Sequence, residues 1–114
     1  WLEDQPGAES PTLVLRSAAN RELRLVHADC YKVDLSVATH VFCANLTWPD
    51  HAVHALGKHL DALPAMRYVA TLKKFPDAEL KRLRHVTTLH LAMSWQDRNA
   101  HSYGVPVYVY ARRK

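Results

Sequence analysis

A strand–helix–strand pattern over residues 41–72 constrains the fold of this chain more than any other feature. The short apolar run Val41–Ala44 is followed by Pro49 and Asp50, which are typical of a first helical turn. Apolar residues then recur at the spacing i, i+3, i+7 and i+10, which predicts one buried helical stripe of Val53, Leu56, Leu60 and Leu63. Pro64 ends this helix, and Arg67–Leu72 is the second apolar strand. Two strands joined by one helix should run parallel, with a right-handed crossover between them.

The rest of the chain adds strands on both sides of this unit. A strand is expected at Leu23–His27, whereas the acidic, turn-rich segment Trp1–Pro11 is expected to be a loop or linker. A short helix over Asp77–Leu83, with its first residue as the N-cap, follows the unit. The last two strands, His85–Met93 and Val105–Tyr110, are joined by only about ten residues without a helix, so they should pair antiparallel.

Composition limits the partners and the chemistry. A chain of 114 residues, 48% of them hydrophobic, can bury a core as one domain. No apolar run approaches the roughly 20 residues that cross a bilayer, so we expect no membrane partner. The eight histidines are scattered and lack a carboxylate or thiolate partner at ligand spacing, so no metal site is expected.

Positive charge gathers late in the sequence. The formal net charge is +4, and the isoelectric point is about 9.3. The late basic residues are Lys73, Lys74, Lys81, Arg82, Arg84, Arg112, Arg113 and Lys114. A basic edge of this kind suits nucleic acid or a chromatin surface, and it is equally compatible with a solvated face.

Polar and aromatic residues follow two of the expected strands at the point where each strand ends. Asn45 and Trp48 come after Val41–Ala44, and Asp29 follows Leu23–His27. Open α/β sheets bind their ligands outside the carboxyl ends of the strands, so we expect the active edge at this corner. Asp29 can accept a hydrogen bond from an exocyclic amine, or it can form a simple Asx turn. Taken alone, Asn45 can likewise be a turn former.

Four motifs in this order resemble the C-terminal half of the non-SET histone lysine methyltransferases, the disruptor-of-telomeric-silencing family. The motifs are Ala28-Asp-Cys30, Val41-Phe-Cys-Ala-Asn-Leu-Thr-Trp48, Arg67-Tyr-Val-Ala-Thr-Leu-Lys73, and Met93-Ser-Trp95 followed by Gly104-Val-Pro-Val-Tyr-Val-Tyr110. The resemblance implies an α/β fold, the C-terminal part of a Rossmann-like methyltransferase sheet, with parallel strands ending in an antiparallel β-hairpin. Residues 23–114 would form this half of the catalytic domain, and residues 1–22 would be a linker or partial element.

The resemblance also implies a site for S-adenosylmethionine with a lysine channel beside it. Cofactor binding would fall to Asp29, Cys30, Ala44, Asn45 and Thr71. The catalytic contacts and channel walls would come from Asn45, Trp48, Val69, Trp95 and Tyr110. A dry aromatic channel disfavours the ammonium form of lysine, whose ordinary pKa is about 10.4, and orients its stem for in-line methyl transfer. Asn45 would hold the methionine end of the cofactor or the incoming amine.

The chain departs from the family pattern at several positions, among them Val109 at the first tyrosine of the terminal pair and a longer loop at 96–103, and one part of the fold is missing. Ala44 stands at the first of the family's paired asparagines, and Cys30 stands at its adenine-stacking phenylalanine. The Gly-rich loop and the acidic residue that hold methionine and ribose in this fold would precede Trp1. We therefore expect the chain to be inactive alone and to need the N-terminal half of the catalytic domain as its partner.

Three functions follow as hypotheses. The first is methyl transfer from S-adenosylmethionine to a lysine amine of histone H-three on the nucleosome core, in the nucleus, with the basic residues on DNA or on the acidic histone face. The second is an amino-methyltransferase of RNA or DNA, which needs a stacking ring within reach of a flipped base. The third is a catalytically inactive partner subunit, which Ala44 and the missing half suggest.

Overall fold

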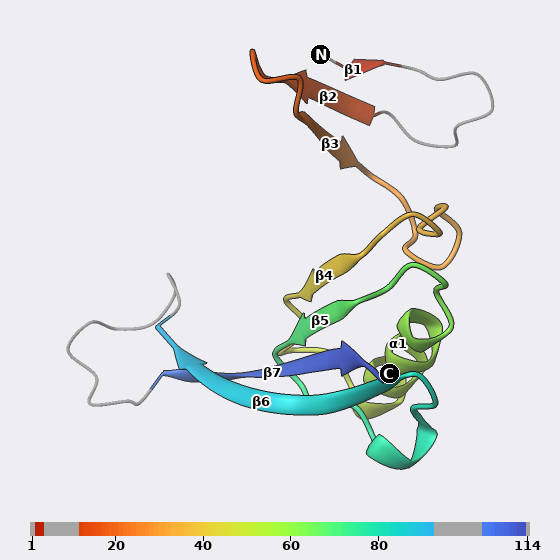
Figure 1. Ribbon diagram of the computed structural model, residues 1–114, viewed down its shortest axis with the longest axis vertical. Helices are drawn as coiled ribbons and strands as arrows, with labels where there is room; N and C mark the ends of the chain where they lie inside the picture. Colours follow the sequence, from red (N-terminus) through yellow and green to blue (C-terminus); the bar gives the residue numbers. More distant parts are fainter. Residues whose placement is uncertain (1, 4–11, 93–103, 114) are drawn as a thin grey trace. The chain divides into compact units, whose positions relative to one another are not determined.

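The computed structural model describes residues 2–3, 12–92 and 104–113 of the chain. The chain is mixed α/β and divides into two compact units, Trp1–Asp34 and Leu35–Lys114, which are described separately (Figure 1). This division falls later than the boundary expected between residues 22 and 23, because the strand that begins at Glu22 pairs with the strand before it.

The first unit carries a three-stranded antiparallel sheet in the order β1-β2-β3. Its strands are β1 (Leu2–Glu3), β2 (Thr12–Arg16) and β3 (Glu22–Val26). Asn20 has a φ of 61°, in the left-handed region, and makes the turn between β2 and β3. The strand expected at 23–27 is thereby confirmed, but it joins this sheet and not the sheet of the strand–helix–strand unit. The expectation of a loop was wrong for residues 2–3, which form β1.

A four-stranded mixed sheet in the order β4-β5-β7-β6 forms the framework of the second unit. Its strands are β4 (His40–Cys43), β5 (Tyr68–Thr71), β6 (Leu83–Leu91) and β7 (Val105–Arg112). β4 and β5 are parallel, which confirms the prediction from the strand–helix–strand pattern. β6 and β7 are antiparallel, as their short connection predicted, and β7 is also antiparallel to β5. The last strand therefore lies between β5 and β6, and these two neighbours run in the same direction.

The expected helix is α1 (Asp50–Asp61), which begins after Pro49 as its N-cap. Three residues of the predicted apolar stripe, Val53, Leu56 and Leu60, are at most 5% exposed, so the helical spacing identified the packed face correctly. Gly57 lies on this face as well, and a Cβ atom there would come within 3.0 Å of the Phe75 ring. Within the described ranges, no helix combines the length and the apolar content that a bilayer crossing requires.

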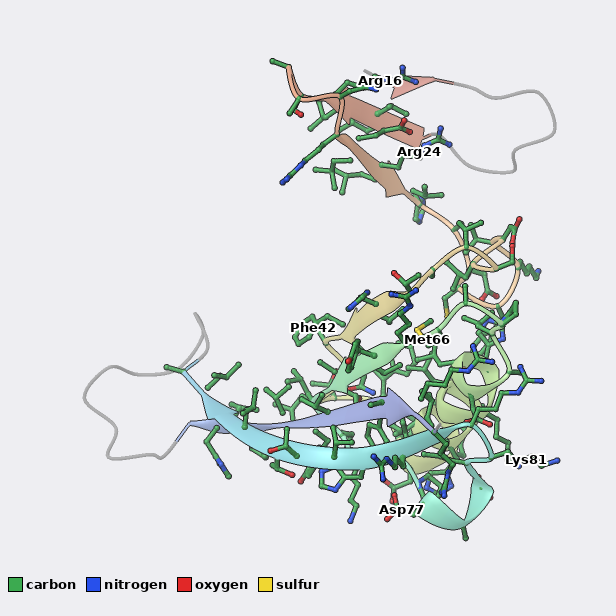
Figure 2. All side chains as sticks on the ribbon, in the orientation of Figure 1. Arg16, Arg24, Phe42, Met66, Asp77 and Lys81 are labelled. Carbon is green, nitrogen blue, oxygen red and sulfur yellow. The ribbon has the colours of Figure 1, made fainter. Side chains whose placement is uncertain are left out.

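The two faces of the second unit's sheet differ in how well they are covered. Val69 and Tyr110 are paired across β5 and β7 and are fully buried. Phe75 packs on the Tyr110 ring, with 5.1 Å between ring centroids, and on Gly57 of α1, so this is the helix-covered face. Phe42 in β4 points away from α1 in Figure 2, and it is 59% exposed. One face is therefore packed by α1, and the other carries exposed apolar side chains.

The helix expected over Asp77–Leu83 is shorter than predicted. The structure has a single 3₁₀ turn, η1 (Asp77–Glu79), with Pro76 in the N-cap position and no side-chain cap hydrogen bond. The reason lies outside the segment, because the Asp61 carboxylate accepts the backbone N–H groups of residues 81–83. These N–H groups cannot then donate within a helix, and the chain extends into β6. The Met93-Ser-Trp95 motif and the polar loop expected at 96–103 lie outside the described residues.

Candidate functional site at the carboxyl ends of the parallel strands

Asn45 joins the carboxyl ends of β4 and β5. It follows β4, is 1% exposed, and lies beside Thr71 at the end of β5, which is fully buried. The Oδ1 atom of Asn45 accepts the Leu72 N–H at 3.1 Å and the Thr71 hydroxyl at 3.0 Å. The parallel register places Cys43 opposite Thr71. Asn45, two residues after Cys43, and Thr71 therefore lie at the same end of the two strands. The structure thus brings together two of the predicted site residues.

The orientation of the Asn45 amide is fixed by these contacts. A backbone N–H can only donate, so the atom that meets Leu72 must be the amide oxygen and not the nitrogen. The Nδ2 atom is buried and has no hydrogen-bond partner among the described residues. An unsatisfied buried donor costs about 1–3 kcal/mol, and native proteins contain few of them. Among the residues that the structure describes, the corner therefore holds an oriented donor with no protein acceptor.

Trp48 and Lys73 fix the turn between β4 and α1. The Trp48 N–H donates to the Asn45 carbonyl oxygen at 3.1 Å, and the Trp48 side chain is half-buried. The Lys73 ammonium donates to the Trp48 carbonyl oxygen at 2.6 Å and lies 3.5 Å from an exposed Asp50 carboxylate oxygen. Lys73 was not predicted as a site residue. Its place just after β5, with an acidic residue at the start of α1, indicates the ion pair that the structure contains. Its carbonyl contact holds the turn more firmly than the exposed ion pair does.

Val69 and Tyr110 are core residues in this structure. Both are fully buried, and the Tyr110 hydroxyl accepts the Phe75 backbone N–H at 3.0 Å. Burial disfavours the tyrosinate anion and raises the pKa of Tyr110 to about 12. The two residues are paired across β5 and β7, and they were expected to line a channel, but they lie in the packed interior. Of the expected channel walls, Trp48 is partly exposed and Trp95 lies outside the described residues.

The remaining predicted cofactor residues have simpler roles. Asp29 and Cys30 belong to the first unit, and the Asp29 carboxylate accepts the Tyr31 N–H at 2.9 Å, which is an Asx turn. Cys30 is a free, half-buried thiol whose pKa is raised by burial and, to a lesser extent, by the Asp29 charge. Ala44 is exposed next to Asn45. Of the four predicted site residues Asp29, Asn45, Thr71 and Trp95, the structure brings Asn45 and Thr71 into contact.

No protein-family model, curated protein or solved structure matches this chain. Within the described ranges, no group of three or more His, Cys, Asp or Glu side chains is placed to hold a metal ion. The described corner offers an amide donor, a tryptophan ring and a lysine-braced turn. These groups can bind and orient a polar ligand, and none of them is placed as a nucleophile.

Proposed function

We propose that this chain is the C-terminal half of an S-adenosylmethionine-dependent protein-lysine N-methyltransferase that acts on a histone of the nucleosome core. The single observation that carries the proposal is the Asn45 amide, an oriented and buried donor at the carboxyl edge of two parallel strands. Ligands of open α/β sheets bind at this edge. The resemblance of the four motifs points to S-adenosylmethionine as the ligand, and the amide is a donor from which this ligand can accept a hydrogen bond.

The chemistry of the amide favours one end of the cofactor. Because Oδ1 is already used by Leu72 and Thr71, the capacity that remains to Asn45 is donation from Nδ2. The carboxylate of the methionine moiety is an acceptor. The nitrogen of the target lysine must instead keep its lone pair free to attack the methyl carbon. Asn45 is therefore better suited to hold the methionine end of S-adenosylmethionine than to hold the incoming amine.

The second unit's sheet supports the proposal that another half of the domain is needed. Its parallel pair followed by an antiparallel hairpin is the arrangement that the family resemblance predicts for this half. β4 is a terminal strand of the described sheet, and two apolar side chains next to its edge, Phe42 and Tyr68, are 59% and 49% exposed. Parallel sheets are normally covered on both faces. An N-terminal half would extend the sheet at β4 and cover these side chains.

A catalytically inactive partner subunit is the second candidate, and the burial of two expected channel residues favours it. Val69 and Tyr110 are fully buried, and the Tyr110 hydroxyl is engaged by the Phe75 backbone. Ala44 also replaces an asparagine of the family pattern. A subunit of this kind would keep the fold and the nucleosome surface without transferring methyl groups.

Transfer of a labelled methyl group separates these functions. The chain, joined to the half that we propose precedes residue 1, is incubated with tritiated S-adenosylmethionine and with nucleosomes, free histones or RNA. The proposal predicts labelling of a histone lysine, strongest on nucleosomes. Labelling of RNA alone would refute the histone proposal and support an RNA or DNA amino-methyltransferase. No labelling of any substrate would favour the inactive subunit.

Equilibrium dialysis of the isolated 114-residue chain with labelled cofactor tests the division into halves. We expect no binding at micromolar concentrations, because the described residues supply an amide donor but no Gly-rich phosphate-type loop and no ribose-binding acid at a strand end. Micromolar binding by this chain alone would refute the two-half account.

A further inference from the structure

A hollow of about 310 Å³ lies at the start of β6 and the end of β7, away from Asn45 in the fold of the second unit. Its lining residues are Asp77, Leu83, Arg84, His85 and Arg113. The volume is equivalent to about ten water molecules, which is room for a phosphate group with part of its ester chain. The lining contains two guanidinium groups and one imidazole against a single carboxylate.

The carboxylates around this hollow already have partners. Asp77 lies 3.9 Å from the Lys74 ammonium, and Glu79 lies 3.8 Å from the Lys58 ammonium. Asp61 directs both of its oxygens to three backbone N–H groups. Asp77, the one carboxylate of the lining, has a lysine beside it, so the lining keeps a net positive charge.

Pairing between the backbones of β6 and β7 holds the arginines around the hollow close together. Arg84 lies opposite Ala111 in the β6–β7 ladder, and the Arg113 N–H donates to the Arg82 carbonyl oxygen at 2.6 Å. Lys81, Arg82, Arg84 and Arg113 are exposed, and among the described residues none of them has an ion pair within 4.0 Å. Like charges on neighbouring strands repel, so this arrangement favours an external anion.

We propose that this hollow binds a backbone phosphate of a nucleic acid, with Arg84 and Arg113 as its principal ligands. The planar guanidinium fork matches two phosphate oxygens at once, which an ammonium group cannot do. Arg82, whose carbonyl oxygen accepts the Arg113 N–H, lies beside the hollow and would meet an adjoining phosphate of the same strand. Contacts of this kind position a protein on the nucleic acid without reading its sequence.

This inference concerns a partner of the proposed methyltransferase, but it does not depend on methyl transfer. Phosphate binding at the hollow needs no cofactor and no second half of a catalytic domain. A chain that binds DNA here and transfers no methyl group would satisfy the inference while failing the proposed function. The two are therefore tested by different measurements.

Fluorescence anisotropy with a labelled duplex of mixed sequence, without S-adenosylmethionine, tests the proposal at several salt concentrations. The double variant Arg84→Gln/Arg113→Gln is compared with Arg21→Gln/Arg67→Gln, which removes the same charge from exposed arginines outside the hollow. Each lost phosphate contact lowers the slope of log affinity against log salt by about 1, so the first variant should lose about 2 units and the control should keep its slope. A third variant, Arg84→Lys/Arg113→Lys, keeps the charge and should retain most of the slope while binding more weakly.

Equal loss of slope in the glutamine variant and its control would overturn the proposal, since binding would then follow net charge alone. Failure of the parent chain to bind the duplex at low salt would overturn it as well. A polyglutamate peptide serves as competitor at matched charge. If it displaces the duplex and its own binding depends on Arg84 and Arg113, the hollow is an acidic-peptide site and the nucleic-acid assignment is wrong.

Discussion

Replacement of Asp61 by asparagine perturbs the contact that ties the end of α1 to the start of β6. Asp61 is 7% exposed, and its Oδ1 atom accepts the N–H groups of Arg82 at 2.9 Å and Leu83 at 2.8 Å. Its Oδ2 atom accepts the Lys81 N–H at 3.0 Å. Asparagine keeps one acceptor but presents an NH₂ group to a backbone donor at the other position. One charge-assisted hydrogen bond is lost, and the two that remain are made to a neutral amide oxygen in place of a carboxylate.

The magnitude follows from these three bonds. A hydrogen bond to a charged group contributes about 1.5–3 kcal/mol, and facing donors add a desolvation cost. We therefore expect Asp61→Asn to lower the free energy of unfolding by about 2–4 kcal/mol at neutral pH, a large share of the about 5–15 kcal/mol available to a domain of this size. Urea denaturation followed by far-ultraviolet circular dichroism measures this loss. Asp77→Asn is the control, and it should change stability by less than about 0.5 kcal/mol because its ion pair is exposed.

The pH dependence gives a second test of the same contact. Burial works against the Asp61 carboxylate, but the three backbone donors together outweigh it and hold its pKa below the ordinary range. A folded-state pKa below the unfolded value means that the stabilisation is present above about pH 4 and is lost as the pH falls through the folded pKa. The gap between parent and variant should therefore be largest near neutral pH and should shrink on acidification. Equal stability of the two proteins at neutral pH, or a gap that does not narrow in acid, would refute this reasoning.

Two further substitutions test the helix-covered face. Gly57→Ala should lower the free energy of unfolding by about 1–3 kcal/mol, although alanine is the better helix former, because its Cβ would come within 3.0 Å of the Phe75 ring; a more stable variant in urea denaturation would contradict this packing. Tyr110→Phe should lower stability by about 1–2 kcal/mol, because the Phe75 N–H loses its partner. The ultraviolet titration of tyrosine should also lose its latest step, near the pKa of about 12; persistence of that step in the variant would assign it to another residue.

The local pattern of the sequence was sufficient to predict the helix and its neighbouring strands. The spacing of Val53, Leu56 and Leu60 marks one buried face, and Pro64 predicted the end of the helix to within a few residues, since α1 ends at Asp61. Parallel pairing of β4 with β5 follows from the helix between them, and antiparallel pairing of β6 with β7 follows from their short connection. These features depend on residues close together in the chain.

Contacts between distant residues were not predictable in the same way. Asp61 captures N–H groups about twenty positions later and so shortens the helix expected after Asp77. The Tyr110 hydroxyl accepts the Phe75 backbone N–H, 35 positions earlier, so Tyr110 lies in the core and not in the expected channel. Periodicity and turn chemistry do not encode such pairings. Asn45 is the exception, because its position after a parallel strand already indicated the edge at which it meets Thr71.

Asn45→Asp tests the central claim most directly, because aspartate keeps the acceptor used by the Leu72 N–H and removes the Nδ2 donor. Methyl transfer to nucleosomes is measured with the chain joined to its proposed cofactor-binding half, beside the urea midpoint of the same protein. We predict a loss of about 10²–10³-fold in the rate, the range known for removal of one donor from an active site, with a lower midpoint that still leaves the protein folded under the assay conditions. Methyl transfer at the parent rate by a folded Asn45→Asp protein would contradict the assignment of this corner to the cofactor.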